Sequence, residues 1–324
     1  MHKVLGIIAE YNPFHNGHLY HLGTSKKLTG ADYTVAIISG NFTQRGSTSI
    51  VDKWSKTKMA LENGIDLVIE LPVLYSISSA ENFADGAIKI LNSLGIVDYL
   101  SFGAETSDIS ILNNIANILC SEHEEYKNLL SIELEKGLSF PKARENALLD
   151  YIKNTDDNVP ENRIIDFEKY SKVLSSPNNI LGIEYLKALK KYKSSIKPVC
   201  ISRFATDYNS TKLSKIENST SNCNPQNFAS ATAIRELIKN KNFDTIKTVI
   251  PLESYLILMN CINSGCIVPD LNCFEKEIIY TLRKMTIEEI ADIPDVSEGL
   301  EFSIKKAANS CNNINEFLDI VNSK

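Results

Sequence analysis

Short apolar runs alternate with helix-forming segments through the first part of the chain. Residues 4–10, 33–39, 67–71 and 99–103 are rich in Val, Ile and Leu and have the length of buried strands. The segments between them are long enough for crossover helices, which favours right-handed βαβ units and a parallel sheet covered on both faces. Residues 198–202 predict a strand that returns to this sheet. We therefore expect an α/β fold with a Rossmann-like parallel sheet.

Capping residues mark the ends of two of the connecting helices. Asp52 can cap a helix that stops at Gly64. Ser78 and Glu81 have the spacing of a capping box before a helix that ends near Gly95. These signals place helices after the second and third strands, as a parallel sheet requires.

Changes in composition divide the chain into regions. Residues 108–175 are polar with helical spacing, and we expect them to be a helical insertion in a catalytic domain that spans residues 1–240. Residues 207–227 are rich in Ser, Thr and Asn, which predicts a surface loop. Residues 241–324 carry apolar residues at helical spacing and predict a separate C-terminal helical domain.

Composition excludes several classes of protein. The chain has 324 residues and a formal charge of −6, which excludes a globally basic nucleic-acid binder. We expect a cytoplasmic protein, because nothing resembles a signal peptide and no run approaches the ~20 apolar residues that span a bilayer. An odd number of cysteines without a Cys-x-x-Cys pair predicts reduced, mostly buried thiols rather than disulfides or structural zinc. The cysteines are Cys120, Cys200, Cys223, Cys261, Cys266, Cys273 and Cys311.

Polar loops follow the ends of four predicted strands, at residues 10–18, 40–50, 70–72 and 103–107. The carboxyl ends of parallel strands share one edge of a sheet, and open α/β proteins bind their ligands there. We therefore expect these loops to converge on one crevice.

The first of these loops contains His15-Asn16-Gly17-His18 at the predicted start of a helix. Backbone N–H groups at a helix N-terminus attract phosphate, and imidazole N–H groups can stabilise a phosphate that gains charge in a transition state. Gly17 would let a flat base lie close to the backbone. By spacing alone, two polar residues at a helix cap explain the histidines equally well. His21 lies on the next turn, where a structural or peripheral role is expected, and the sequence offers no third nearby ligand for zinc.

A second polar turn lies far downstream, where residues 230–235 read Ser-Ala-Thr-Ala-Ile-Arg. Ser230 and Thr232 can present hydroxyls at a helix start, and Arg235 offers paired donors to phosphate. Taken alone, an N-cap followed by a solvated arginine explains this turn. Together and in this order, the two motifs resemble the signature of the nucleotidylyltransferase superfamily, the relatives of class I aminoacyl-tRNA synthetases.

Longer segments resemble a narrower family, the bacterial tRNA(Met) cytidine acetate ligases. Residues 10–21 (EYNPFHNGHLYH) look like the opening motif of that family. Residues 39–46 (SGNFTQRG) and 53–60 (KWSKTKMA) resemble the loop and helix that follow its second strand. Further similar segments are 66–72 (DLVIELP), 102–105 (FGAE) and 177–182 (PNNILG), so the resemblance covers nearly the whole chain.

The resemblance implies an ATP-dependent ligase. Members of the family activate acetate as acetyl-adenylate with release of pyrophosphate, and then acetylate the exocyclic amine of the wobble cytidine of elongator tRNA(Met). Mg2+ usually accompanies ATP, but no ligand set for it stands out in the sequence, and neither DNA nor a membrane is implied as a partner. The implied ATP contacts are Ile7, Ile8, Ala9, Glu10, Tyr11, Asn12, Pro13, Phe14, His15, Asn16, Gly17, His18, Leu19, Tyr20, Gly103, Asn178, Asn179, Arg203, Ser230 and Thr232.

The same resemblance implies roles for the charged residues. Adenylate formation needs positioning and charge neutralisation more than a covalent nucleophile. His15 and His18 would act on the transition-state phosphate, and Arg235 with Ser230 or Thr232 would act on the leaving phosphates.

A group of basic residues is expected near the same crevice. Arg45, Lys53, Lys56 and Lys58 either contact phosphates of ATP or tRNA, or belong to an ordinary solvated helix face. Arg203 would hold another phosphate or the ribose.

Two other functions stay open at this stage. An adenylyltransferase that transfers AMP from ATP to a small phosphorylated cofactor precursor would share both motifs, although the predicted helical regions favour a macromolecular substrate. A nucleotide-binding regulator without catalysis is disfavoured, because His15, His18 and Arg235 are intact. Members of the resembled family usually continue past residue 324 with a basic segment, so we expect a chain that stops here to hold tRNA weakly.

Overall fold

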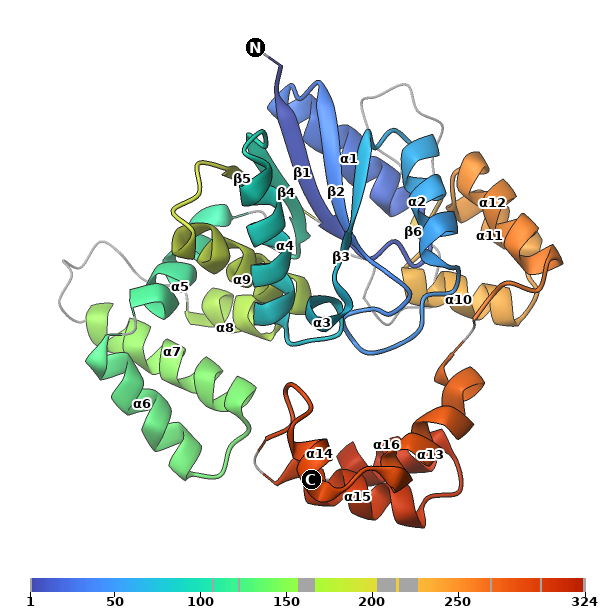
Figure 1. Ribbon diagram of the computed structural model, residues 1–324. Helices are drawn as coiled ribbons and strands as arrows, with labels where there is room; N and C mark the ends of the chain where they lie inside the picture. The colour runs from blue at the N-terminus through green and yellow to red at the C-terminus, as the bar shows by residue number, and fades with distance from the viewer. Residues whose placement is uncertain are drawn as a thin grey trace.

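The computed structural model describes residues 2–106, 108–121, 123–156, 167–202, 214–215, 227–268, 270–297 and 299–322 (Figure 1). Five strands form one parallel sheet in the order β3-β2-β1-β4-β5. The strands are β1 (Val4–Ala9), β2 (Tyr33–Ser39), β3 (Leu67–Leu71), β4 (Tyr99–Ala104) and β5 (Lys197–Ser202). The structure confirms the predicted α/β fold with a Rossmann-like parallel sheet.

Helices cover both faces of this sheet, and each face has its own hydrophobic cluster. One cluster buries residues of α4 (Ala80–Leu94), α5 (Ile109–Ser121) and α9 (Pro177–Lys191). The other buries residues of α1 (Asn16–Thr29), α2 (Lys53–Glu62), α10 (Ala231–Lys239), α11 (Phe243–Val249) and α12 (Leu252–Asn263). A short helix, α3 (Val73–Ser76), follows β3.

The structure has the predicted capping residue at α2, whereas the cap of α4 lies one position after the predicted one. Asp52 caps α2 and accepts hydrogen bonds from the backbone N–H groups of Trp54 and Ser55 at 2.8 and 3.0 Å. The cap of α4 is Ser79, which accepts from the N–H of Asn82, and not the predicted Ser78. The Ser78 hydroxyl has another partner in the C-terminal part of the chain.

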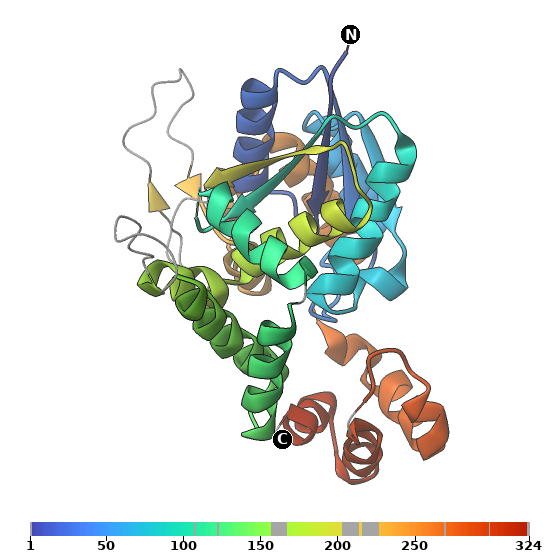
Figure 2. The same ribbon diagram turned by 90° about the vertical axis from the view of Figure 1, so that its left-hand side faces the viewer.

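The predicted helical insertion contains α5, α6 (Glu124–Glu135), α7 (Phe140–Asp156) and α8 (Phe167–Ser175). Helix α5 contributes Ile111, Leu112 and Ile115 to the core beside the sheet, so it belongs to the sheet domain. Helices α6 and α7 pack against each other and project below the carboxyl edge of the sheet (Figure 2).

The C-terminal helical unit begins later than the sequence suggested. A third hydrophobic cluster joins the last helices, while α11 and α12 belong to the cluster on the sheet. The boundary expected at residue 240 therefore lies after Asn263, because the apolar faces of α11 and α12 are buried beside α2 and α10. The unit consists of η1 (Leu271–Phe274), α13 (Glu275–Lys284), α14 (Ile287–Ala291), α15 (Leu300–Ser310) and α16 (Ile314–Asn322).

The surface loop expected at residues 207–227 lies almost wholly outside the described residues. The described parts are β6 (Ser214–Lys215) and β7 (Asn227–Phe228), which pair antiparallel.

The described cysteines are all free thiols, but they are not mostly buried. Cys261 and Cys311 are buried, whereas Cys120, Cys266 and Cys273 are exposed. Within the described ranges, no helix is long and apolar enough to cross a membrane.

Candidate active site

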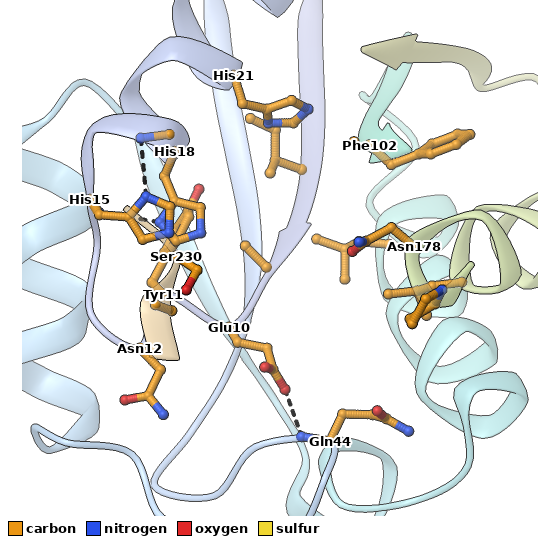
Figure 3. A pocket seen from close by; sticks show the side chains of 18 of the residues that line it. Glu10, Tyr11, Asn12, His15, His18, His21, Gln44, Phe102, Asn178 and Ser230 are labelled. Atoms are coloured by element: carbon orange, nitrogen blue, oxygen red, sulfur yellow. Dashed lines mark hydrogen bonds between the residues drawn. The ribbon is translucent and has the colours of Figure 1, made fainter. Parts of the chain in front are cut away.

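A cavity of about 320 Å³ lies at the carboxyl edge of the sheet (Figure 3). The end of β1 and the start of α1 supply one wall, and the start of α10 lies beside them. The ends of β4 and β5 and the helices α4 and α9 supply the opposite wall. The cavity thus lies where an open parallel sheet of this order binds its ligands.

His15 and His18 form the N-terminal cap of α1 between them. Nδ1 of His15 accepts a hydrogen bond from the N–H of Gly17 at 3.0 Å. Nδ1 of His18 accepts from the N–H of His15 at 3.2 Å, which completes a capping box made of two imidazoles. The two rings stack with their centroids 3.7 Å apart.

This cap fixes the tautomer of both rings. Because each Nδ1 accepts from a backbone N–H, the proton of a neutral ring is carried by Nε2. His15 and His18 therefore both offer an Nε2–H donor at the N-terminus of a helix, where phosphate is also favoured by the backbone.

Gly17 is required by the fold of this cap. A Cβ at position 17 would lie 2.8 Å from Cε1 of His15. The missing side chain thus leaves room for the His15 ring. Gly17 also lines the cavity, and its role in making room for a base stays a prediction.

The Tyr11 side chain packs against the ring of His18. Its backbone is left-handed, with φ of 46°, and its side chain is buried. The Tyr11 ring lies 4.8 Å, centroid to centroid, from both Phe14 and His18. A non-glycine residue in this conformation is strained, and such strain is often found at functional sites.

The second predicted motif, residues 230–235, lies at the start of α10, beside the wall to which α1 belongs. Ser230 caps α10 and accepts from the N–H of Ala233 at 3.1 Å. Arg235 donates from Nη1 to the carbonyl of Asn12 at 3.0 Å and from Nη2 to Oγ1 of Thr232 at 3.1 Å. These contacts bring the guanidinium from α10 to the loop that leads into α1.

The start of α9 forms part of the opposite wall, and Glu105 holds it in place. The carboxylate of Glu105 accepts from Nδ2 of Asn178 at 2.6 Å and from the N–H of Asn179 at 3.0 Å. Asn178 and Gly103 line the cavity, whereas Asn179 is buried behind them.

The loop after β2 closes the lower side of the cavity. The N–H of Gln44 donates to Oε1 of Glu10 at 2.6 Å (Figure 3). Lys56 lies beneath this loop with its side chain fully buried, and its Nζ donates to the carbonyls of Ser39 and Gly40 at 3.0 and 2.8 Å. Burial lowers the pKa of Lys56 to about 8, although the carboxylates of Glu10 and Glu70 act in the opposite direction.

The four basic residues near the crevice therefore have different surroundings. Arg45 lines the cavity. Lys53 forms an ion pair with Glu70 at 2.7 Å, Lys56 is structural, and Lys58 is exposed on α2. Lys56 does not belong to a solvated helix face, because the loop after β2 covers its side chain.

The structure brings most of the predicted site residues to one cavity. Those that line it are Ile7, Ile8, Ala9, Glu10, Tyr11, Asn12, His15, Gly17, His18, Tyr20, Gly103, Asn178, Ser230 and Arg235. Six others are not among the lining residues: Pro13, Phe14, Asn16, Leu19, Asn179 and Thr232. Phe14 is part of the core, and Nδ2 of Asn16 donates to the carbonyl of Thr248 at 3.1 Å. Arg203 lies outside the described residues.

Other lining residues were not predicted from the sequence. His21 faces the cavity, and its Nε2 lies 3.0 Å from the hydroxyl of Ser101. The remaining ones with large or polar side chains are Gln44, Phe83, Phe102, Leu181, Tyr185, Ser202 and Phe228. Gln44, Phe102 and Leu181 lie in segments that resemble the family, but Phe83 and Tyr185 carry no such signal.

The sheet order, the histidine cap at the first strand end and the Ser–Arg helix start together define a nucleotidyl-transferring class of enzyme. Comparison with known proteins agrees, since the model of the family described as HIGH Nucleotidyl Transferase matches residues 2–324. The chain belongs to this family.

Two curated relatives of this chain carry the name of the same enzyme. The tRNA(Met) cytidine acetate ligase of Acetivibrio thermocellus is 46% identical over 98% of this chain and 72% of its own length. The ligase of the same name from Caldanaerobacter subterraneus is 47% identical over 99% of this chain and 74% of its own length. The crystal structure of Thermotoga maritima TmcAL bound with alpha-thio ATP has a TM-score of 0.87 at 36% identity, and the match covers 99% of this chain and 71% of that one.

Proposed function

We propose that the protein is a cytoplasmic ligase that activates acetate with ATP and acetylates the wobble cytidine of elongator tRNA(Met). The relatives named tRNA(Met) cytidine acetate ligase support this substrate pair. The alpha-thio ATP bound to Thermotoga maritima TmcAL supports ATP as the nucleotide. The observation that carries the proposal is the histidine cap, with two Nε2–H donors at a helix start inside the cavity.

The first step is adenylate formation. An oxygen of the acetate carboxylate attacks the α-phosphorus of ATP, the bond to the bridging oxygen breaks, and pyrophosphate leaves with the electron pair. His15 and His18 donate to the α-phosphate as it gains charge, and a donor of this kind is worth roughly 3–4 kcal/mol. Arg235 neutralises charge on the leaving phosphates from the α10 side, and the hydroxyl of Ser230 donates to them.

The adenosine end of ATP is proposed to lie against the opposite wall. Gly103 and Asn178 line this part of the cavity, and Ser202 lies at the adjacent strand end. Mg2+ is proposed to accompany the triphosphate. The described residues contain no group of three His, Cys, Asp or Glu that could hold an ion. The residues of this chain then act by positioning and by charge neutralisation.

The C-terminal helical unit is proposed to help bind tRNA. It lies below the carboxyl edge of the sheet, on the same side as α6 and α7 (Figure 1). Ser78, beside the cavity loop, donates to Oδ2 of Asp295 in this unit at 2.6 Å. An RNA that contacts the unit would therefore approach the side of the sheet on which the cavity lies.

The direct test uses the whole chain with ATP, acetate and elongator tRNA(Met). We expect the anticodon cytidine to gain the mass of one acetyl group, as measured by nucleoside mass analysis after digestion. A tRNA that lacks the cytidine at the wobble position is the matched control. An unchanged mass at high tRNA concentration, where weak binding is overcome, would contradict the proposed acceptor.

A further inference from the structure

The two walls of the cavity differ in chemistry. The α1 and α10 side carries His15, His18 and Arg235, which suit phosphate. Glu10, at the end of β1, lies between this side and the wall that contains α4 and α9, and that wall carries aromatic rings, among them that of Tyr185 (Figure 3). A carboxylate repels phosphate, so this part of the cavity suits a ligand other than the triphosphate.

Glu10 is fixed with one oxygen directed to the protein. Its Oε1 accepts from the N–H of Gln44 at 2.6 Å, and Nε2 of Gln44 donates to the carbonyl of Ser78 at 3.0 Å. Oε2 of Glu10 makes no hydrogen bond with any residue in the described part of the chain. A carboxylate held in this way presents its second oxygen as an acceptor for a bound group.

The Tyr185 hydroxyl can donate a hydrogen bond, whereas the Glu10 carboxylate can only accept one. Its side chain is 3% exposed, and its hydroxyl makes no hydrogen bond within the described ranges although it lines the cavity. Its ring lies 5.7 Å from that of Phe102, centroid to centroid. Burial, and secondarily the nearby Glu10 carboxylate, raise the pKa of Tyr185, so the hydroxyl stays protonated. A ligand that accepts from this hydroxyl in the cavity would give it a partner.

An acceptor and a donor that line one cavity match the Watson–Crick edge of cytosine. Cytosine presents its exocyclic amine next to the unprotonated N3, whereas uracil presents a carbonyl oxygen next to N3–H. Carboxylates accept from the cytosine amine in protein–nucleic acid complexes. Single-stranded bases are also commonly held against aromatic side chains, and Phe83 lines the same side.

We propose that Glu10 and Tyr185 form the acceptor-base site, in which Oε2 of Glu10 accepts from the cytosine amine and the Tyr185 hydroxyl donates to N3. This inference rests on the proposed function and assigns residues to its second step. Glu10 selects cytosine over uracil, because uracil would place its carbonyl oxygen, an acceptor, against the carboxylate, which is also an acceptor.

Glu10 also has a chemical role in this arrangement. The amine nitrogen attacks the carbonyl carbon of acetyl-adenylate, an N–C bond forms, and the C–O bond to the phosphate breaks. AMP leaves with the electron pair of that bond, and the proton of the amine passes to Oε2 of Glu10. The exocyclic amine of cytosine is a weak nucleophile, so a base within hydrogen-bond reach speeds the attack.

Binding of free nucleotides tests the site without the transfer reaction. With the ATP site filled by a non-hydrolysable ATP analogue, cytidine monophosphate and uridine monophosphate are titrated by calorimetry. We expect wild type to bind the cytidine nucleotide about tenfold more tightly, Glu10→Gln to lose most of this preference, and Tyr185→Phe to bind the cytidine nucleotide more weakly. Glu62→Gln, at an exposed glutamate on α2, is the control that should keep it. Equal binding of the two nucleotides by wild type would overturn the proposal.

Kinetics then separate this inference from the proposed function. We expect the ratio of acetyl transfer to acetate-dependent pyrophosphate exchange to fall about 100-fold in Glu10→Gln, while the melting temperature stays near that of wild type. An unchanged ratio would contradict the role of Glu10 as base. If wild type shows no acetate-dependent exchange, the proposed function fails, whereas the nucleotide preference still measures the base site.

Discussion

The imidazole rings of His15 and His18 stack with their centroids 3.7 Å apart and their planes 22° from parallel. Each ring uses its Nδ1 to cap α1, so the structural role of these histidines and the chemical role that we propose for them reside on different ring atoms. Asparagine can keep the capping function of His15 but has no group in the place of Nε2. The two roles can therefore be separated by substitution.

We expect His15→Asn to lower the rate of pyrophosphate exchange about 100-fold or more with little change in melting temperature. His15→Ala should lose the same activity and also about 1 kcal/mol of stability, because the N-cap acceptor is gone. The measurements are exchange rate and thermal unfolding for both variants. An asparagine variant with nearly wild-type exchange would mean that His15 only caps the helix.

Gly182 determines the position of Phe102 in the cavity wall. A Cβ at position 182 would lie 2.8 Å from Cε2 of Phe102, so Gly182→Ala must displace this ring. We expect a loss of about 1–3 kcal/mol of stability and weaker ATP binding. Gly23→Ala, within α1 and with open space around the new Cβ, is the matched control and should be neutral or slightly stabilising. Equal effects of the two substitutions would contradict the close packing of α9 on β4.

Lys56 gives the protein a specific dependence of stability on pH. Its folded pKa of about 8 lies below the ordinary 10.5, so between these values the unfolded chain holds more protons and stability rises with pH. The stability of wild type relative to Lys56→Met should therefore increase by about 1–2 kcal/mol from pH 7.5 to 9.5. Urea unfolding of both proteins at several pH values measures this difference. A difference that does not change with pH would show that Lys56 keeps its ordinary pKa.

Ser78 and Asp295 link the sheet domain to the C-terminal helical unit through a 2.6 Å hydrogen bond. Hydrogen bonds to a charged partner contribute about 1.5–3 kcal/mol, and less where water reaches them, as at this partly buried contact. A double-mutant cycle of Ser78→Ala and Asp295→Asn should give a coupling free energy of about 1 kcal/mol. Strictly additive effects would mean that the two units are not held together by this contact.

Much of the sheet could be predicted from the sequence. The strands at residues 33–39 and 67–71 have the predicted bounds, because continuous apolar runs between polar turns leave little choice of structure. The histidine motif and the Ser230 cap were also recognisable locally, since capping depends on neighbours in sequence.

The remaining features depend on contacts that are distant in sequence. Tyr185 lies among the apolar residues of α9 and is indistinguishable from a core residue until α9 packs beside β4. Lys56 lies among other lysines and has the pattern of a surface residue, yet the loop after β2 covers it. Helices α11 and α12 have the same spacing as the last helices, and only their packing shows that they belong to the sheet domain.

Acetate-dependent exchange of labelled pyrophosphate into ATP tests the central claim most directly. We predict that wild type incorporates label into ATP when acetate is present, and that omission of acetate abolishes the exchange. Exchange that needs a phosphorylated cofactor precursor in place of acetate would contradict the claim and identify an adenylyltransferase.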